Sequence, residues 1–185
     1  MPRFLFICLL VSTLSAAAGE PPAQVVLSWS GQTTETTLPQ RGSDILRWKW
    51  LVRLYHVSLY LAPTAEDVIS SAPKRLRMDY LRTFSRDDMV RATELTIGRN
   101  LDATTLKALQ PWLEIWNASY PTIAVGDCLE FDHLPGGILL MRHNGMLCGS
   151  LTHEGFARAL FAIWLGPNPV DVSVRDQLIR SPQRK

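Results

Sequence analysis

The side chains best suited to hold an anion lie within one apolar stretch. Residues 46–61 read LRWKWLVRLYHVSLYL and contain no Gly or Pro, a composition that predicts one long β-strand. Because side chains on a strand alternate between its faces, Arg47, Arg53 and Tyr55 would share a face that continues into apolar residues. A guanidinium matches a carboxylate in geometry, and a phenol can donate to the same oxygen. The stretch therefore predicts a site for an amphipathic or aromatic acid. The alternative is a strand edge whose cations point into water, the usual place for charged residues.

Other kinds of chemistry have little support in the sequence. The four histidines show no metal-ligand spacing, and no CxxC, HExxH, phosphate-binding glycine motif or GxSxG occurs. We therefore expect no metal and no cofactor. The chain has 19 basic and 17 acidic residues, a net charge of +2, and no dense basic run outside its C-terminal tail. This charge balance does not indicate nucleic-acid binding.

Cys128 and Cys148 lie on the first and third strands of a predicted meander. The three strands are residues 126–133, 138–143 and 146–151, and Asn144-Gly145 is a strong signal for a tight hairpin turn. The first and third strands of a meander are not neighbours and lie about 9–10 Å apart. A disulfide needs Cα atoms within about 7 Å. We therefore predict two separate, buried, free thiols.

The N-terminus has the features of a secretory signal peptide. A short basic start and an apolar run are followed by small residues that end at Ala16-Ala17-Ala18. The run is too short to span a bilayer, so we expect residues 1–18 to be removed and the protein to be periplasmic or secreted. Residues 19–185 would form one domain without membrane insertion.

The order of the remaining elements predicts an α+β fold. Before the meander we expect strands at residues 24–29, 35–38, 46–61 and 74–83. Helices are expected at residues 65–71, 86–97, 103–118, 153–165 and 172–179. Ser85, Asp102 and Thr152 are candidate N-caps, and Pro111 should kink or break its helix. Strands and helices in this order favour an antiparallel sheet with helices grouped on one face.

Several short motifs, taken in order, resemble the chalcone isomerase-like family, with an exported bacterial-type member as the nearest description. The resemblance spans Gln24 to Ile179. It rests on Arg47, Leu54-Tyr55, Ser58–Leu61, Pro73–Leu76, Phe84–Asp88, Val125–Asp127, the Asn144-Gly145 hairpin, and Phe156-Ala157 through Ile163–Gly166. It implies an open-faced β-sandwich, a large antiparallel sheet backed by helices, which agrees with the α+β prediction.

The resemblance implies two kinds of function. Chalcone isomerases use a strand arginine, a threonine on the same strand and a tyrosine near a helix start. Here Arg47 matches the arginine, but Tyr55 stands at the threonine position and Arg86 near the tyrosine position. Fatty-acid-binding relatives hold the carboxylate with the arginine and a tyrosine, which suits Arg47 and Tyr55 with Arg53 nearby. The apolar end of the strand and the helix from Ser85 to Ile97 would then line the tail pocket.

Three hypotheses follow from the residues and the resemblance together. The first is an exported binder of a small amphipathic or aromatic acid, anchored by Arg47 and Tyr55. The second is an intramolecular lyase of the chalcone isomerase type, in which Arg47 stabilises the reacting oxyanion and Tyr55 replaces the threonine. The third is a structural or interaction protein on the same fold, because a fold does not fix a function.

Overall fold

A seven-stranded antiparallel sheet forms the body of the protein, with its strands in chain order. The computed structural model describes residues 21–27, 36–62, 65, 68–69 and 72–180. The strands are β1 (Gln24–Leu27), β2 (Thr36–Trp48), β3 (Val52–Leu61), β4 (Lys74–Tyr80), β5 (Cys128–Leu134), β6 (Ile138–His143) and β7 (Met146–Thr152). The predicted signal peptide lies outside the described residues, and so does most of the predicted helix 65–71.

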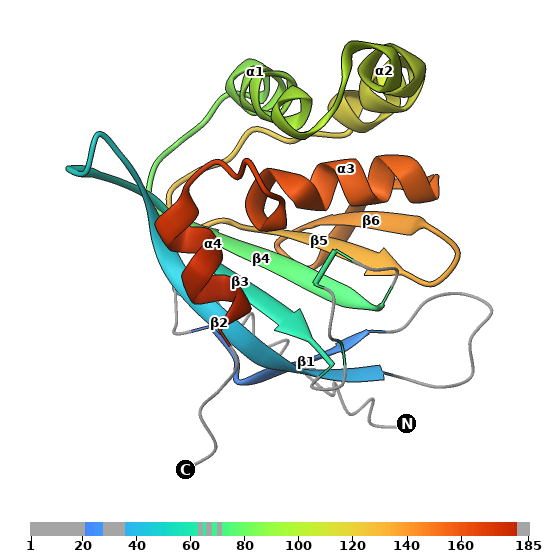
Figure 1. Cartoon of the computed structure of the whole chain (residues 1–185). Helices are drawn as coiled ribbons and strands as arrows, with labels where there is room; N and C mark the ends of the chain where they lie inside the picture. Colours follow the sequence, from blue (N-terminus) through green and yellow to red (C-terminus); the bar gives the residue numbers. More distant parts are fainter. Residues whose placement is uncertain (1–20, 28–35, 63–64, 66–67, 70–71, 181–185) are drawn as a thin grey trace, which may run out of the picture.

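The helices are grouped on one side of the sheet (Figure 1). They are α1 (Arg86–Ile97), the short 3-10 helix η1 (Gly98–Asn100), α2 (Ala103–Ala118), α3 (Glu154–Leu165) and α4 (Val172–Ile179). Helix α3 contacts α1, α2 and α4 as well as β6, so it lies at the centre of the helical layer. The predicted α+β architecture, a large antiparallel sheet backed by helices, is confirmed.

The predicted single strand 46–61 is wrong, because the chain reverses in the middle of it. Strands β2 and β3 form a hairpin whose turn is residues 49–51, with Leu46 opposite Tyr55 and Arg47 opposite Arg53. Lys49 and Trp50 adopt φ values of 48° and 69° in this turn. Left-handed turn positions usually hold Gly, Asn or Asp, so the sequence carries no recognisable turn signal here.

The helix ends mostly follow the predicted caps. Ser85 forms a capping box at the start of α1, and the Asp102 side chain accepts the Thr105 amide at the start of α2. Helix α2 is not broken at Pro111, so of the two expected effects, a kink or a break, the break does not occur. Pro111 is exposed, so water can satisfy the carbonyl that loses its donor. The cap of α3 is His153, whose ring accepts a backbone amide, and not Thr152 as predicted.

The meander β5–β6–β7 is confirmed, and it separates the two cysteines as predicted. Both are free thiols, and Cys128 is buried. Cys148 is exposed, which corrects our expectation of a buried thiol. The reason is that β7 is the last strand of the sheet, and most of its residues face solvent.

The two faces of the sheet are covered in different ways. The main core lies between the sheet and the helices and includes Val57, Leu76 and Phe131. On the opposite face, β1 and the start of β2 contribute to a smaller core with Tyr60. The same face carries a buried network of charges. Its members are Arg75, Arg77, Asp79, Glu130, Asp132 and Arg142.

Helix α4 packs directly on β2 at Gly42. A Cβ atom at this position would collide with the backbone carbonyl oxygen of Gln177. No side chain larger than hydrogen fits without moving the helix, so Gly42 fixes how closely α4 approaches the sheet.

His133 is a buried titratable side chain at the end of β5. Its Nδ1 lies 3.5 Å from the Lys74 Nζ, and its Nε2 lies 3.6 Å from a carboxylate oxygen of Glu154. Burial and the charge of Lys74 lower the pKa of His133, so the ring is neutral at pH 7.

Candidate functional site

An apolar cavity of about 450 Å³ lies between the sheet and helices α1 and α3. Its volume is in the range of about 300–1,000 Å³ that small-molecule pockets occupy. The walls come from every layer of the fold. They are Leu46, Leu54, Tyr55, Met78, Tyr80, Thr83, Phe84, Asp88, Met89, Ala92, Thr93, Thr96, Tyr120, Phe131, Ile163, Trp164 and Val170.

Strand alternation explains why the floor of the cavity is apolar. On β4, Met78 and Tyr80 point toward the helices while Arg77 and Asp79 belong to the charge network on the other face. The roof comes from one stripe of α1 that includes Met89 and Thr93. The prediction that this helix lines a pocket agrees with the structure.

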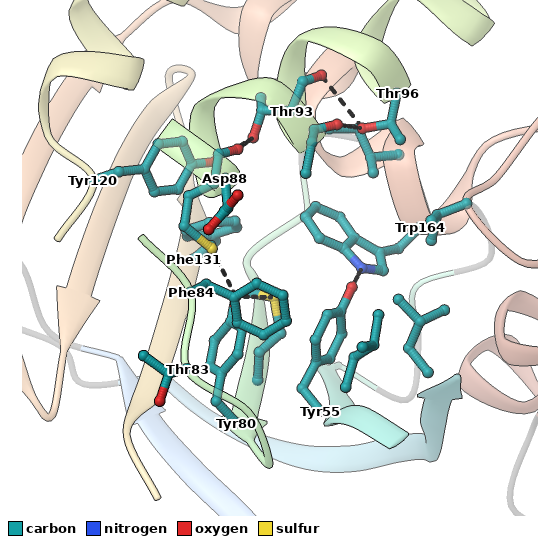
Figure 2. Close-up of a pocket in the computed structure, with 17 residues that line it drawn as sticks. Tyr55, Tyr80, Thr83, Phe84, Asp88, Thr93, Thr96, Tyr120, Phe131 and Trp164 are labelled. Carbon is teal, nitrogen blue, oxygen red and sulfur yellow. Dashed lines mark hydrogen bonds between the residues drawn. The ribbon is translucent and has the colours of Figure 1, made fainter. Parts of the chain in front are cut away.

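Tyr55 is the polar group at the bottom of the cavity. It is buried, and its hydroxyl accepts a hydrogen bond of 3.0 Å from the indole N–H of Trp164 (Figure 2). Among the described residues, no acceptor lies within hydrogen-bond distance for the hydrogen of the Tyr55 hydroxyl itself. Burial raises the pKa of Tyr55, so the phenol stays protonated at physiological pH. Tyr55 can therefore donate one hydrogen bond to a bound molecule.

Two further phenols line the same space. The Tyr80 ring lies 5.2 Å from the Tyr55 ring. Among the described residues, the hydrogen-bond partners of its hydroxyl are the sulfur of Met89, at 3.8 Å, and that of Met78. Sulfur is a weak acceptor, so Tyr80 is a second potential donor. Tyr120 is already bonded to the Thr93 hydroxyl at 2.8 Å. Burial raises the pKa values of Tyr80 and Tyr120, the latter to about 12.

Charge at the cavity is confined to one carboxylate. None of the described lining residues is Lys, Arg or His. Asp88 lies at an exposed edge and is engaged in the α1 capping box, where hydrogen bonds from the side chain and backbone of Ser85 lower its pKa. The described residues include no cluster of three or more His, Cys, Asp or Glu that could hold a metal. The cavity therefore suits a ligand that is largely apolar and has a neutral acceptor at its polar end.

Only one of the predicted site residues lies in this cavity. Arg47 is exposed, and its guanidinium donates to the Ile45 carbonyl at 3.2 Å. It borders a second, more polar hollow near Asp171 at the start of α4. Arg53 is also exposed and lies 3.1 Å from the His56 ring. The expectation that Arg47 faces inward beside Tyr55 and the apolar hollow is therefore wrong.

This separation bears on the isomerase hypothesis. An oxyanion on a substrate in the cavity would have to be stabilised by Arg47, and Arg47 lies in a different hollow from Tyr55. The phenols that do line the cavity are neutral donors, which suit the binding of a carbonyl oxygen. The geometry thus favours binding over catalysis.

The sequence alone did not reveal most of the cavity. Tyr80, Tyr120 and Trp164 come from three distant segments, and aromatic residues in regular elements usually belong to the core. Tyr80, Tyr120 and Trp164 line the cavity and also belong to the main hydrophobic core. The sequence did predict two parts of the lining, Tyr55 and the apolar stripe of α1. Among the described residues, no helix is both long and apolar enough to cross a membrane.

Comparisons with known proteins agree on one fold. The sequence model of the chalcone isomerase-like family matches residues 23–179. Among solved structures, the crystal structure of a fatty-acid-binding protein from Arabidopsis thaliana is similar, with a TM-score of 0.59 and 11% sequence identity. The alignment covers 84% of this chain and 96% of the plant protein. A comparison with curated protein sequences finds no significant match.

Proposed function

Because this chain belongs to the chalcone isomerase-like family, we propose that it is a non-catalytic binder of a small amphipathic molecule, such as a fatty acid or an aromatic acid. The ligand occupies the apolar cavity between the sheet and helices α1 and α3. The observation that carries this proposal is an open space of about 450 Å³ into which a buried phenol can donate a hydrogen bond. The similar plant structure is described as a fatty-acid-binding protein, which supports the same class of ligand.

The lining restricts the polar end of the ligand. A carboxylate deep in the cavity would meet no cation among the lining residues that the structure describes, and Asp88 at the exposed edge would repel it. A carboxylic acid would therefore bind in its protonated form, because burial without a counter-charge raises its pKa. Esters, ketones and alcohols of the same length need no such proton.

The experiment is a fluorescence titration with cis-parinaric acid, followed by displacement with palmitic acid and with its methyl ester. We expect both to displace the probe, and the ester to do so with an affinity that is independent of pH. The acid should bind more tightly as the pH falls toward the pKa of its carboxyl group. Failure of every probe to bind would contradict the proposal.

Two matched tyrosine variants locate the site. Tyr55→Phe removes one of the two available phenol donors in the cavity and should weaken binding by roughly tenfold, the value of one buried hydrogen bond. Tyr60→Phe also removes a buried hydroxyl, one that donates to the Pro22 carbonyl on the opposite face, and should leave binding unchanged. Equal losses in both variants would show that the probe does not occupy the cavity.

Export is the second part of the proposal. Its basis is the pattern of residues 1–18, which ends in small residues after an apolar run. The intact mass of the protein recovered from its host should lack these 18 residues. Recovery of the full chain from the cytoplasm would contradict export and leave the binding proposal intact.

A further inference from the structure

The turn between β2 and β3 exposes large apolar side chains that the cavity does not use. We call residues 48–51 the hairpin tip. Trp48 is 54% exposed, Trp50 is 92% exposed and Leu51 is 87% exposed. The hairpin projects away from the sheet and the helical layer (Figure 1). Exposed apolar groups gathered in one place commonly mark an interaction surface.

Cations surround the hairpin tip. Arg47 and Arg53 are opposite each other just behind the turn, and Lys49 places its Nζ 4.5 Å from the centre of the Trp48 ring. In the part of the chain that the structure describes, no carboxylate lies within ion-pair distance of these three side chains. Two acids share a hollow with Arg47 without forming an ion pair with it: Asp44 accepts the Ile45 amide at 2.7 Å, and Asp171 caps α4.

We propose that the hairpin tip is a docking site for the surface of an anionic phospholipid bilayer. Trp side chains favour the interface between water and lipid, and Lys and Arg near that interface are attracted to anionic headgroups. The ladder between β2 and β3 satisfies the strand backbone behind the turn, so only a few residues need to enter the headgroup layer. Leu51 and Trp50 enter the apolar boundary, while Arg47 and Arg53 remain at the level of the phosphates.

The charge pattern separates this surface from another exposed apolar pair. The β6–β7 hairpin exposes Met146 by 76% and Leu147 by 55%. The nearest arginine on that hairpin, Arg142, is in an ion pair with Asp132. That hairpin therefore lacks available cations and serves as a matched control.

Docking by the hairpin tip does not depend on the proposed ligand. Trp50 and Leu51 do not line the apolar cavity, while Leu46 and Tyr55 at the base of the same hairpin do. The base lies about 13 Å behind the turn, at about 3.3 Å for each of four residues. Docking would thus bring the sheet end of the cavity close to the lipid, where an amphipathic ligand is found.

The test measures binding of the protein, as it is recovered from its host, to vesicles of phosphatidylcholine with about 30% phosphatidylglycerol. The protein is floated with the vesicles on a density gradient. We expect wild-type protein to float with anionic vesicles and much less with pure phosphatidylcholine. Raising the salt from about 0.1 M to about 1 M should weaken binding, because the screening length falls from about 10 Å to about 3 Å.

Variants at the tip should remove this binding while the fold remains. Trp50→Ala with Leu51→Ala should lower vesicle partitioning by at least about tenfold. The control Met146→Ala with Leu147→Ala should change it less than about twofold. Replacing Arg47, Lys49 and Arg53 with Gln should cost roughly fivefold for each charge. The matched charge control replaces Arg99, Lys107 and Arg158, which are exposed elsewhere.

Three results would overturn the proposal. One is that wild-type protein stays at the bottom of the gradient with anionic vesicles. Another is that the Met146 and Leu147 control loses as much binding as the tip variant. The third is that the wild-type protein does not bind vesicles but forms a concentration-dependent dimer, and that Trp50→Ala with Leu51→Ala makes it monomeric. The tip would then contact a second copy of the chain. Unfolding temperatures and parinaric acid binding of each variant show that the fold and the cavity are intact.

Discussion

Asp132 is the carboxylate on which the charge network of the sheet depends most. Its side chain is 2% exposed, and it accepts hydrogen bonds from Arg75 Nη2 at 2.8 Å and Arg142 Nε at 3.4 Å as well as from Arg75 Nε. Asp132→Asn keeps the volume and removes the charge. The variant leaves the Arg75 guanidinium, 11% exposed, with Glu130 at 3.0 Å as its remaining carboxylate.

The expected loss of stability follows from this geometry. Breaking a buried ion pair from one side typically costs about 3–5 kcal/mol, because the remaining charge stays buried. Since Glu130 still compensates part of the Arg75 charge, we expect a value near the lower end, about 3 kcal/mol. For a domain of this size, 1 kcal/mol lowers the unfolding temperature by about 2–4 °C. The unfolding temperature should therefore fall by roughly 6–12 °C.

The assay is equilibrium urea unfolding, with calorimetry for the unfolding temperature. The control is Asp176→Asn. The Asp176 side chain is 54% exposed, and its carboxylate lies 2.7 Å from Arg175. An exposed ion pair contributes about 0–1 kcal/mol, so the control should change stability by less than about 1 kcal/mol. Equal effects of the two variants, or a loss at Asp132 below about 1 kcal/mol, would refute the view that the network is buried and energetically coupled.

Three more predictions test the packing and the titratable groups. Gly42→Ala should destabilise the fold by about 1–3 kcal/mol in urea unfolding, because its methyl group meets the α4 backbone. The control Gly98→Ala, whose nearest contact is a side-chain carbon at 3.4 Å, should be close to neutral. Lowering the pH below about 6.5 should destabilise the protein. His133 has a lower pKa in the folded chain than in the unfolded chain, so the unfolded chain binds the proton first. His133→Gln should flatten that pH dependence of the urea midpoint, and an unchanged slope would contradict the assignment. With a thiol-reactive dye, Cys148 should be modified in the folded protein, while Cys128, buried and with its pKa raised, should react only in denaturant. Rapid modification of both thiols would show that β5 opens.

Local signals in the sequence were enough for the helices and for the C-terminal meander. Ser85 and Asp102 each place a side-chain oxygen where it caps an amide three residues on, and this interaction depends only on neighbouring residues. The Asn144-Gly145 turn is likewise local, since both residues adopt the positive φ values that a tight hairpin needs. Helix 172–179 is also as predicted.

The β2–β3 turn could not be predicted by the same reasoning, because its cause is not local. Lys49 and Trp50 adopt left-handed conformations for which they have no intrinsic preference. The extensive pairing of β2 with β3 and of β3 with β4 holds the chain in that reversal. An apolar run without Gly or Pro satisfies the pattern of a strand, whether it is one strand or two.

Because the turn was not predicted, the wrong residue, Arg47, was also expected beside Tyr55 on the same face of the sheet. In an unbroken strand, Arg47 and Tyr55 are separated by an even number of residues and therefore share a face. In the hairpin, Tyr55 is opposite Leu46, and cross-strand partners share a face. Leu46 thus joins Tyr55 in the wall of the cavity, and Arg47, one residue further on, does not. The three-residue reversal changes an expected cationic site into an apolar one.

Strand β4 shows why the apolar cavity and the buried charges depend on each other. Its sequence KRLRMDY alternates between the cavity side, with Met78 and Tyr80, and the network side, with Arg75, Arg77 and Asp79. Side chains around an open cavity have fewer packing partners than those of a filled core, so the strands of its floor depend more on their backbone pairing and on contacts from the other face. Directional ion pairs join β4 to β5 on that far face, from Arg75 and Arg77 to Glu130 and Asp132. The charge network therefore lies directly behind the floor of the cavity and adds to the β4–β5 backbone pairing, although none of its members lines the cavity.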